Sequence, residues 1–420
     1  MSAFTNTVRK HRPDYYLVLW TALLMLLGLV VMYAIGPQRA HVLNLVGSAD
    51  YSDTYFFIKQ FFSLSFAVTV FFIAARIPLS WWQKYAAQLV VVSLAACVLL
   101  AFFGFLHLGI APNINGAVRW FNLGPLGSLQ PAEFLKFALL LFVAGFLGMR
   151  HTQGKINDKD TTIIPVLTVL LVAVFFVIFL QKDMGTGMTL VAIFISMLYA
   201  AGMKTKNFVI ILMILLALGV LSILTASHRM DRVMTFLSGE TSATSSQPSA
   251  EQYHITQAKI AIGSGGLFGV GIGNSVQSTG YLPEAINDSV FAIMGEIFGF
   301  AGLVVILGIF AALLLRVLRV ADHLPNMAAR LVAAGVFGWL ASHIIINVAA
   351  MTGVFPLTGI TLPLLSFGGA SMAFIAGALG LVFQLSHFTA NSTEVEGGTH
   401  EDSRGRRRLG RTRYANRSRA

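Results

Sequence analysis

Apolar residues fill a series of long runs in this chain, and polar residues gather between the runs. Each run is close to the ~20 residues that an α-helix needs to cross the hydrocarbon core of a bilayer. The pattern therefore predicts an all-α polytopic membrane protein with about ten transmembrane helices between residues 15 and 387. The expected spans cover roughly residues 15–35, 56–76, 87–109, 131–149, 162–180, 186–203, 207–226, 288–315, 328–350 and 361–387.

Lys and Arg occur mainly in alternate connections between these spans. With residues 1–14 in the cytoplasm, they fall in the loops after the second, fourth, sixth and eighth spans and in the C-terminal tail. Short cytoplasmic loops carry an excess of Lys and Arg. We therefore expect an even number of spans with both termini in the cytoplasm.

The two long polar segments outside the spans differ in character. The outer loop 227–287 contains a Ser/Thr-rich piece, 239–252, with the composition of a mobile linker. After it, Tyr253–Ile262 is predicted as a short helix at the outer membrane surface. Residues 388–420 are expected to form a disordered, basic cytoplasmic tail, because their composition cannot build a core.

Composition agrees with a membrane protein and limits the choice of partners. The chain is 56% hydrophobic and 11% charged, against ~25% charged residues in an average soluble domain. Much of the net charge of +11 comes from the tail 404–419, and a basic tail beside a membrane favours anionic lipid over nucleic acid. The single Cys97 excludes an intramolecular disulfide, and no His/Cys cluster has zinc spacing.

Several charged residues lie inside or at the outer ends of the spans. An acid at the centre of a membrane helix costs about 2.5–3.5 kcal/mol on insertion scales, so such residues usually face a cavity or a partner. Each also has a structural alternative: Glu133 and Lys136 can form a local ion pair, and Asp183 and Asp288 can cap helices. The charged residues of this set are Glu133, Lys136, Lys182, Asp183, Lys259, Asp288 and Glu296.

The glycine-rich stretch 261–273 follows the predicted surface helix. It lacks the Lys-Ser/Thr of a nucleotide-binding loop, although its backbone N–H groups can meet a lipid diphosphate. Outward-facing polar residues without a soluble domain suit two classes of protein: a transporter, or an enzyme that acts on a membrane-borne substrate. Composition does not separate them.

Five motifs, in order, give the chain a resemblance to a known family. Together they resemble the SEDS family of cell-wall polymerases, which act in shape, elongation, division and sporulation, and the resemblance is closer to the division-type members. The motifs are NGAVRW with QPAEFLK (115–136), DMGTG (183–187), QAKIAIGSGGLFGVGIGNSVQ (257–277), YLPEAINDSVFAIMGEIFGF (281–300) and MTGVFPLTGITLPLLSFGGAS (351–371). The chain departs from the family pattern at Lys182, at Ile286-Asn287 and at Phe367.

The resemblance implies a peptidoglycan glycosyltransferase with the SEDS fold. Such an enzyme polymerises lipid II into glycan strands at the outer face of the cytoplasmic (inner) membrane, and the division-type motifs suggest the septum. Asp288 corresponds to the family's loop aspartate and is the expected general base. The residues expected to bind substrate are Arg119, Trp120, Glu133, Lys136, Asp183, Lys259, Gly266 and Glu296.

The chemistry of the reaction implies further needs. The diphosphate leaving group requires charge stabilisation, which Arg or Lys can supply with or without a divalent cation, Mg²⁺ or Mn²⁺. The expected partners are lipid II, a class B penicillin-binding protein with transpeptidase activity, and other membrane proteins of the divisome. The alternatives are a lipid II flippase, an elongation-type polymerase and a scaffold without catalytic function.

Overall fold

The computed structural model describes residues 12–389, except 46, 48–49, 114–115, 125–126, 226–228, 231 and 235–249. The predicted basic tail from residue 390, the first eleven residues and most of the Ser/Thr-rich piece 239–252 lie outside the described residues.

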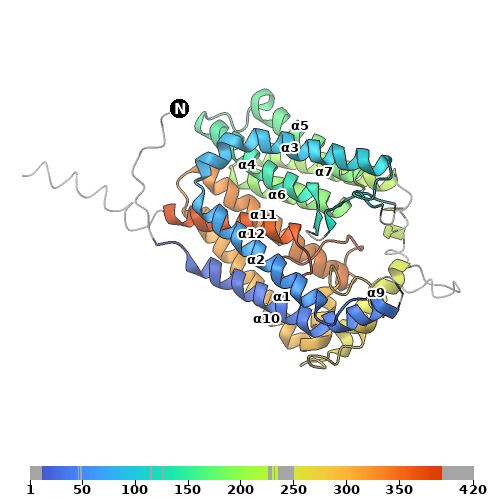
Figure 1. The fold of residues 1–420 in the computed structure, drawn as a ribbon. Coiled ribbons are helices and arrows are strands. Elements are labelled where there is room, and N and C mark those ends of the chain that lie inside the picture. Colours follow the sequence, from blue (N-terminus) through green and yellow to red (C-terminus); the bar gives the residue numbers. More distant parts are fainter. Residues whose placement is uncertain are drawn as a thin grey trace, which may run out of the picture.

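The described residues form an almost entirely helical bundle (Figure 1). Nine helical stretches are long and apolar enough to cross a membrane, and the shorter apolar helix α6 brings the described total to ten. The fold class predicted from the sequence is confirmed. The helices of the bundle are α1 (Tyr15–Leu45), α2 (Tyr55–Arg76), α3 (Leu79–Phe105), α4 (Pro131–Thr152), α5 (Ile164–Phe175), α6 (Met184–Ala200), α7 (Thr205–Leu224), α10 (Val290–His323), α11 (Met327–Met351) and α12 (Ala370–Leu385).

Short elements lie at the ends of these helices. Helix α9 (Ala250–Ser264) contains the predicted surface helix, and strands β1 (Phe121–Asn122) and β2 (Ser128–Leu129) pair antiparallel between α3 and α4. Single helical turns, Lys159–Ile163 and Phe176–Leu180, extend α5 at both ends into one apolar span.

Two spans differ from the prediction in a way that matters for the site. The last one was expected from residue 361, but α12 begins at Ala370, and most of the chain between α11 and α12 has no regular secondary structure. Pro363 and the left-handed Gly359 (φ +72°) lie in this connection, and both residue types disfavour a helix interior. Apolar composition alone suggested a helix because this segment is buried against the bundle.

Helix α10 is longer than predicted and is broken near its outer end. Gly299 has φ 68° and ψ −171°, outside helical geometry. A side chain at Gly299 would overlap the backbone of Leu267 and Gly269, so the glycine permits the close approach of the loop that follows α9.

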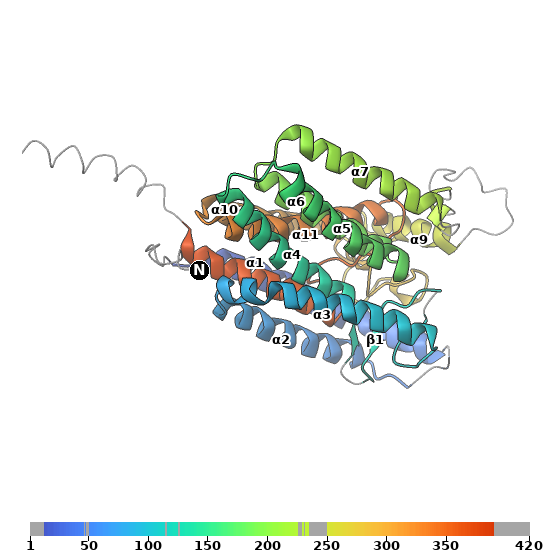
Figure 2. The ribbon, with the colours of Figure 1, turned by 90° about the horizontal axis from the view of Figure 1, so that it is seen from above.

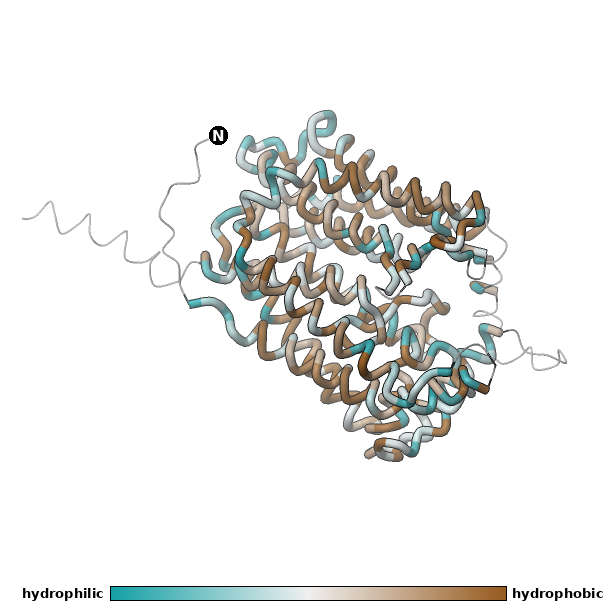
Figure 3. The backbone as a smooth tube through the Cα atoms, viewed as in Figure 1, coloured by the Kyte–Doolittle hydropathy of each residue, from teal (hydrophilic) through white to brown (hydrophobic). Residues whose placement is uncertain are grey.

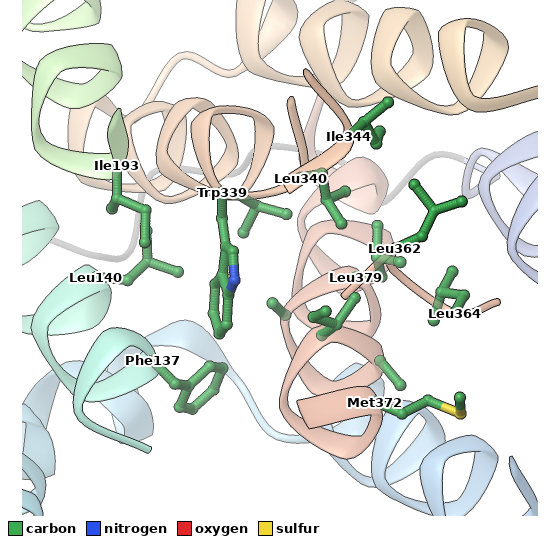
Figure 4. Packing of buried hydrophobic residues seen from close by; sticks show 14 of the residues in the cluster. Phe137, Leu140, Ile193, Trp339, Leu340, Ile344, Leu362, Leu364, Met372 and Leu379 are labelled. Carbon is green, nitrogen blue, oxygen red and sulfur yellow. The ribbon is translucent and has the colours of Figure 1, made fainter. Parts of the chain in front are cut away.

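The core is centred on α4 and α11. In each, 72% of the most apolar window is buried, against 17% in α7, which lies at the periphery of the bundle (Figure 2). In Figure 4, Trp339 of α11 lies between Phe137 of α4 and Leu379 of α12, and Leu140 of α4 lies beside Ile193 of α6. Small residues allow the helices to approach: a side chain at Gly338 would meet α6, and one at Gly380 would meet the backbone of Phe71 on α2.

Figure 3 shows the consequence of this arrangement for the surface. Apolar residues dominate the middle of the bundle, and hydrophilic residues gather toward both ends. The N-terminus of α10 and the C-terminus of α11 meet at one end, because Asn347 contacts the segment that precedes α10. The orientation inferred from Lys and Arg makes this the outer end.

Candidate active site

Asp288 lies in the turn that precedes α10 and is 8% exposed. It is not the cap of that helix: the N-cap is Ser289, which makes no capping hydrogen bond through its side chain. Among the described residues, the Oδ1 atom of Asp288 is buried and has no hydrogen-bond partner. A buried carboxylate oxygen that is left free in this way is available to accept a proton or to bind a ligand.

The main chain around Asp288 is held from two sides. The Asn347 side chain donates one hydrogen bond to the Asp288 carbonyl and another to the Ile360 carbonyl, both 2.7 Å long. Ser289 Oγ donates to the Pro283 carbonyl at 2.8 Å, and His254 Nε2 lies 2.6 Å from the same Oγ. The Ser289 hydroxyl has only one hydrogen, which it donates to the Pro283 carbonyl. It therefore accepts the hydrogen bond from Nε2 of His254. These contacts fix the backbone, while Oδ1 of the carboxylate has no partner among the described residues.

The electrostatic environment of Asp288 favours its neutral form. Burial, and next the negative charge of Glu284, raise the pKa of Asp288 to about 7. Hydrogen bonds from the backbone N–H groups of Asp288 and Ser289, and next the charge of Arg232, oppose this shift. Arg232 is itself held in place, with Nε 2.6 Å from Glu251 and a 3.2 Å hydrogen bond to the Leu357 carbonyl. A carboxyl group with a pKa near neutrality suits a general base at physiological pH.

A second polar group surrounds Asp183 at the start of α6. Asp183 caps this helix, accepting hydrogen bonds from the Thr186 backbone N–H at 3.0 Å and the Thr186 hydroxyl at 2.9 Å. The side-chain amide of Gln130, just before α4, donates at 2.8 Å to Oδ2 of Asp183, the oxygen that also accepts from the Thr186 hydroxyl. Next to it, Arg119 donates to the carbonyl of Lys182 at 2.7 Å. Asp183 therefore caps α6, as its structural alternative predicted, and it also joins the start of α6 to the start of α4.

The predicted ion pair of Glu133 and Lys136 is present and fully buried. The Lys136 Nζ lies 2.6 Å from Glu133 and 3.2 Å from His343 Nε2, and it sits 4.9 Å from the centre of the Trp339 ring. The other ring nitrogen of His343 lies 3.2 Å from the Thr361 carbonyl. This network connects α4 to α11 through the interior of the bundle.

The connection between α11 and α12 touches each of these groups. Its carbonyls at residues 357, 360 and 361 meet Arg232, Asn347 and His343 respectively. The start of α6 packs against it as well, because a side chain at Gly185 would meet Thr358 and Ile360. One stretch of backbone therefore relates the Asp288, Asp183 and Lys136 groups to one another.

The glycine-rich stretch after α9 has a structural role in these contacts. The N–H of Val270 donates to the Glu296 carbonyl at 2.9 Å and that of Gly271 to the Ile297 carbonyl at 3.1 Å, across the break in α10. Gly266 adopts a left-handed backbone (φ +52°), and its carbonyl accepts from the Phe300 N–H. These N–H groups are thus occupied, which disfavours the suggested role as a diphosphate cradle.

Glu296 on α10 holds the loop segment 275–277 through hydrogen bonds. Its carboxylate accepts hydrogen bonds from the Ser275 hydroxyl at 2.5 Å and from the backbone N–H groups of Val276 and Gln277, and it is 2% exposed. Its oxygens are used within the fold rather than free for a substrate.

This arrangement predicts a moderate effect on stability for Glu296→Gln. The amide can keep one acceptor oxygen but places an NH₂ group opposite a backbone N–H, so we expect a loss of about 1–3 kcal/mol in the free energy of unfolding. Chemical unfolding in detergent measures this loss, with Asp322→Asn, at an exposed position, as the control. Turnover per folded molecule should remain; a large loss of turnover with unchanged stability would instead place Glu296 in substrate binding.

The two remaining expected residues lie apart from the buried groups. Lys259 on α9 is exposed, and its side chain crosses the turn at Gly353, where an added Cβ would overlap it. Trp120 is half-buried next to Arg119. The structure thus gathers Arg119 with Asp183, and Glu133 with Lys136, while no described hydrogen bond or ion pair joins these pairs directly to Asp288.

Some residues of the site were missed in the sequence. Arg229, Arg232 and His254 lie in the outer loop, where polar residues are common and carry no signal. His343 and Asn347 could have been found in the sequence. They are polar residues one helical turn apart in an otherwise apolar span, so their side chains point to the same side of the helix.

The chain is similar in sequence to probable peptidoglycan glycosyltransferases and to a sporulation protein. Residues 15–391 match the FtsW/RodA/SpoVE profile, described as "Cell cycle protein". The chain is 33% identical over 384 residues to Stage V sporulation protein E of Bacillus subtilis, covering 91% of this chain and 99% of that protein. It is 34% identical over 374 residues to the probable peptidoglycan glycosyltransferase FtsW of Aliivibrio salmonicida, covering 88% of each chain.

Solved structures show the same fold. A chain from a structure titled "Structural coordination of polymerization and crosslinking by a peptidoglycan synthase complex" aligns with a TM-score of 0.66 and 25% identity, covering 89% of this chain and 97% of that chain. The crystal structure of the rod shape determining protein RodA of Thermus thermophilus aligns with a TM-score of 0.59 and 23% identity, covering 90% and 98%.

Proposed function

The chain belongs to the FtsW/RodA/SpoVE family, the SEDS family, and from this premise we propose that it polymerises lipid II into glycan strands with Asp288 as general base. It is a multi-pass membrane protein and a peptidoglycan glycosyltransferase, as its curated relatives of the FtsW type are named. The single structural observation that supports the role of Asp288 is its buried, unpartnered carboxylate oxygen at the outer end of the bundle.

The chemistry of glycan elongation requires a base at this position. The acceptor's sugar hydroxyl attacks the anomeric carbon of the donor, and its proton passes to Oδ1 of Asp288 as the new C–O bond forms. Asn347 and Ser289 hold the backbone of the base from two sides, so that little reorganisation is needed during the reaction. The bond from the anomeric carbon to the lipid diphosphate breaks, and the diphosphate leaves as a weak base without needing a general acid.

Positive charge is needed where the diphosphate leaves. Of the cations expected from the sequence, Arg119 lies at the outer end beside Lys182. Lys136 is committed to Glu133 and His343 inside the bundle, which suits a positioning role better than contact with a diphosphate. Lys259 is exposed near Gly353 and remains available for a more distant part of the substrate.

A divalent cation fits the residues around Asp288. Mg²⁺ is usually bound by one or two carboxylates together with substrate phosphates and water. Asp288 would supply its second carboxylate oxygen, which is not the proton acceptor, and Glu284 supplies a negative charge within electrostatic reach of Asp288. These two residues would hold the ion, which would neutralise charge on the departing diphosphate. No cluster of three or more His, Cys, Asp or Glu residues exists in the described part of the chain, so the substrate would complete the coordination.

The partners are proposed on the same basis. We expect a class B penicillin-binding protein to activate the chain and crosslink its product, since one structural relative comes from a peptidoglycan synthase complex. We also propose a location at the division septum, with other divisome membrane proteins as partners; the FtsW-type relatives and the family description "Cell cycle protein" support this proposal. The test is polymerisation of lipid II by the purified chain with and without the transpeptidase: a rise in strand synthesis on addition supports the pairing, and equal synthesis contradicts it.

The environment of Asp288 predicts a specific pH dependence. Because its pKa is raised to about 7, the carboxylate form is depleted below that pH, and the polymerisation rate should fall about tenfold per pH unit below about pH 6. The effect on stability has the opposite sign: the stabilising contribution of the protonated group is present below the ordinary pKa of Asp and is lost as pH rises through about 7.

Initial rates and thermal unfolding measured between pH 5 and about 9 test both signs together. A polymerisation rate that rises with the fraction of ionised Asp288, while the thermal stability declines over the same pH range, supports Asp288 as the general base. A rate that is flat across neutrality would mean that another group takes the proton.

A further inference from the structure

Ser289 is the N-cap of α10 and directly follows Asp288, but its hydroxyl does not cap the helix. A Ser at this position usually accepts a hydrogen bond from an N–H of the first helical turn. Here the side chain is buried, and the hydroxyl donates backward to the Pro283 carbonyl at 2.8 Å. The backbone N–H of Ser289 donates to the Glu284 carbonyl at 3.3 Å and also to the Asp288 carboxylate. Ser289 therefore closes the turn that carries the base and touches the base itself.

This turn contains a residue in an unfavourable backbone conformation. Glu284 has φ 50°, in the left-handed region that residues other than glycine rarely adopt. Such a conformation persists only where the surrounding contacts impose it. The two bonds from Ser289, to the carbonyls of residues 283 and 284, flank this residue, and the Asn287 N–H adds a third at 2.9 Å. The shape of the turn, and with it the position of Asp288, depends on these bonds.

The direction of the Ser289 hydroxyl is set by His254 on α9. Nε2 of His254 lies 2.6 Å from Oγ of Ser289. When Oγ accepts this hydrogen bond, its single hydrogen is left for the Pro283 carbonyl; without it, the hydroxyl could rotate away. Burial lowers the pKa of His254, against the opposing charge of Glu284, so the ring is neutral at pH 7 and carries one N–H for this bond.

The side chains just before Asp288 are engaged elsewhere. Ile286 is apolar and buried, and its carbonyl accepts from the Phe367 N–H at 2.8 Å. The amide of Asn287 donates to the carboxylate of the exposed Glu284 at 2.5 Å. Support for the Ser289 hydroxyl therefore comes from outside the turn, through α9.

Helix α9 is itself packed closely against α10, which gives His254 a defined position. Ala258 and Ala261, one and two turns after His254 on the same face of α9, are completely buried. One turn further, a side chain at Gly265 would overlap the carbonyl of Gly295 on α10. His254 therefore transmits the position of α9 to the turn at the start of α10.

A purely structural explanation is that His254 and Ser289 only satisfy each other's hydrogen-bonding groups. That explanation predicts that loss of the pair lowers stability and leaves the rate per folded molecule unchanged. It accounts for the bond between the two side chains. It does not require the residue that receives this bond to donate its own N–H to the carboxylate of the base.

We propose that His254 is a positioning residue for the general base: by directing the Ser289 hydroxyl, it holds the turn that sets Asp288 against the attacking sugar hydroxyl. This inference rests on the proposed function. His254 acts through Ser289 and does not itself contact the substrate. It should therefore affect the rate of the chemical step more than the binding of lipid II.

Steady-state polymerisation by the full chain in detergent, with its transpeptidase partner present, separates positioning from support of the fold. We expect His254→Ala to lower kcat per folded molecule about 10- to 100-fold, as a small misplacement of a catalytic group does, with KM changed less than about twofold. His254→Gln places an amide N–H near the position of Nε2 and should restore most of the rate. Thr256→Ala, at an exposed position on the same helix, is the matched control and should polymerise as the native chain does.

A double-mutant cycle tests whether His254 acts through Ser289. Ser289→Ala should lower kcat by a similar factor, and adding His254→Ala to it should lower kcat no more than about twofold further. Hydrogen exchange of the backbone N–H groups in residues 283–289 gives a readout that does not depend on turnover. Exchange should be faster in His254→Ala, and unchanged in His254→Gln and Thr256→Ala.

Native kcat with native exchange in His254→Ala would overturn the inference. A loss of kcat that His254→Gln does not recover, or independent effects of the His254 and Ser289 changes, would overturn it as well. If His254→Ala does not fold, Ser289→Ala removes a single oxygen, and native kcat in that variant decides against the inference. A native chain that makes no strands, while exchange follows the expected order, would contradict the proposed function and leave the contact of His254 with the turn supported.

Discussion

Replacing Asp288 by Asn should abolish detectable polymerisation of lipid II while leaving the protein folded in the membrane. The amide preserves the size and hydrogen bonding of the side chain but cannot accept the proton from the attacking hydroxyl. A general base contributes about 10²- to 10⁴-fold to a rate, so the remaining activity should fall below that of any other single change in the site.

The stability of this variant distinguishes loss of chemistry from loss of structure. Because burial raises the pKa of Asp288, a charged carboxylate is unfavourable there, and the neutral amide should be at least as stable as the native residue at pH 8. Asp322→Asn makes the same change at an exposed position at the far end of α10 and should keep native turnover. Glycan strands of native yield from Asp288→Asn would remove Asp288 from the mechanism.

The largest effect on stability is expected from the buried pair of Glu133 and Lys136. Lys136 is completely buried and depends on Glu133, and the second oxygen of Glu133 already lacks a described partner. Changing either residue to Ala leaves an unpaired charge inside the bundle, which typically costs about 3–5 kcal/mol. The double change to Leu and Met removes both charges and should recover part of that loss.

A double-mutant cycle on the free energy of unfolding in micelles measures the coupling between the two residues. The partly exposed pair of Asp322 and Arg330, 3.9 Å apart, is a matched control in which the same cycle should give no more than about 0.5–1 kcal/mol. If the effects at Glu133 and Lys136 add independently, the ion pair does not stabilise the fold.

The hydropathy pattern predicted the number and type of the helices because a bilayer imposes the same requirement on every span. It did less well where a segment is buried by the protein itself. The connection before α12 is apolar enough to resemble a helix, but it is packed against polar groups of α11 and the Asp288 loop. The break at Gly299 depends on a loop that approaches from outside the helix, so the sequence of α10 alone does not reveal it.

The same limit applies to the candidate site: contacts within one helix could be predicted from the sequence, and contacts between remote segments could not. The pair of Glu133 and Lys136 was predictable because its members are three residues apart on one helix. The partners that give the other residues their roles are remote: Asn347 is 59 residues from Asp288, and His343 is 207 residues from Lys136. Hydropathy and spacing contain no information about such contacts. The capping role of Asp183 and the supporting role of Glu296 likewise became distinct only with their donors in place.

Synthesis of glycan strands from purified lipid II in detergent tests the central claim most directly. In detergent there is no second compartment, so a flippase has no product to form, whereas a polymerase can join its substrates. We predict strands from the native chain with its transpeptidase partner present, and none from Asp288→Asn under the same conditions. Transport of lipid II across sealed vesicles by a chain that makes no strands in detergent would contradict the claim.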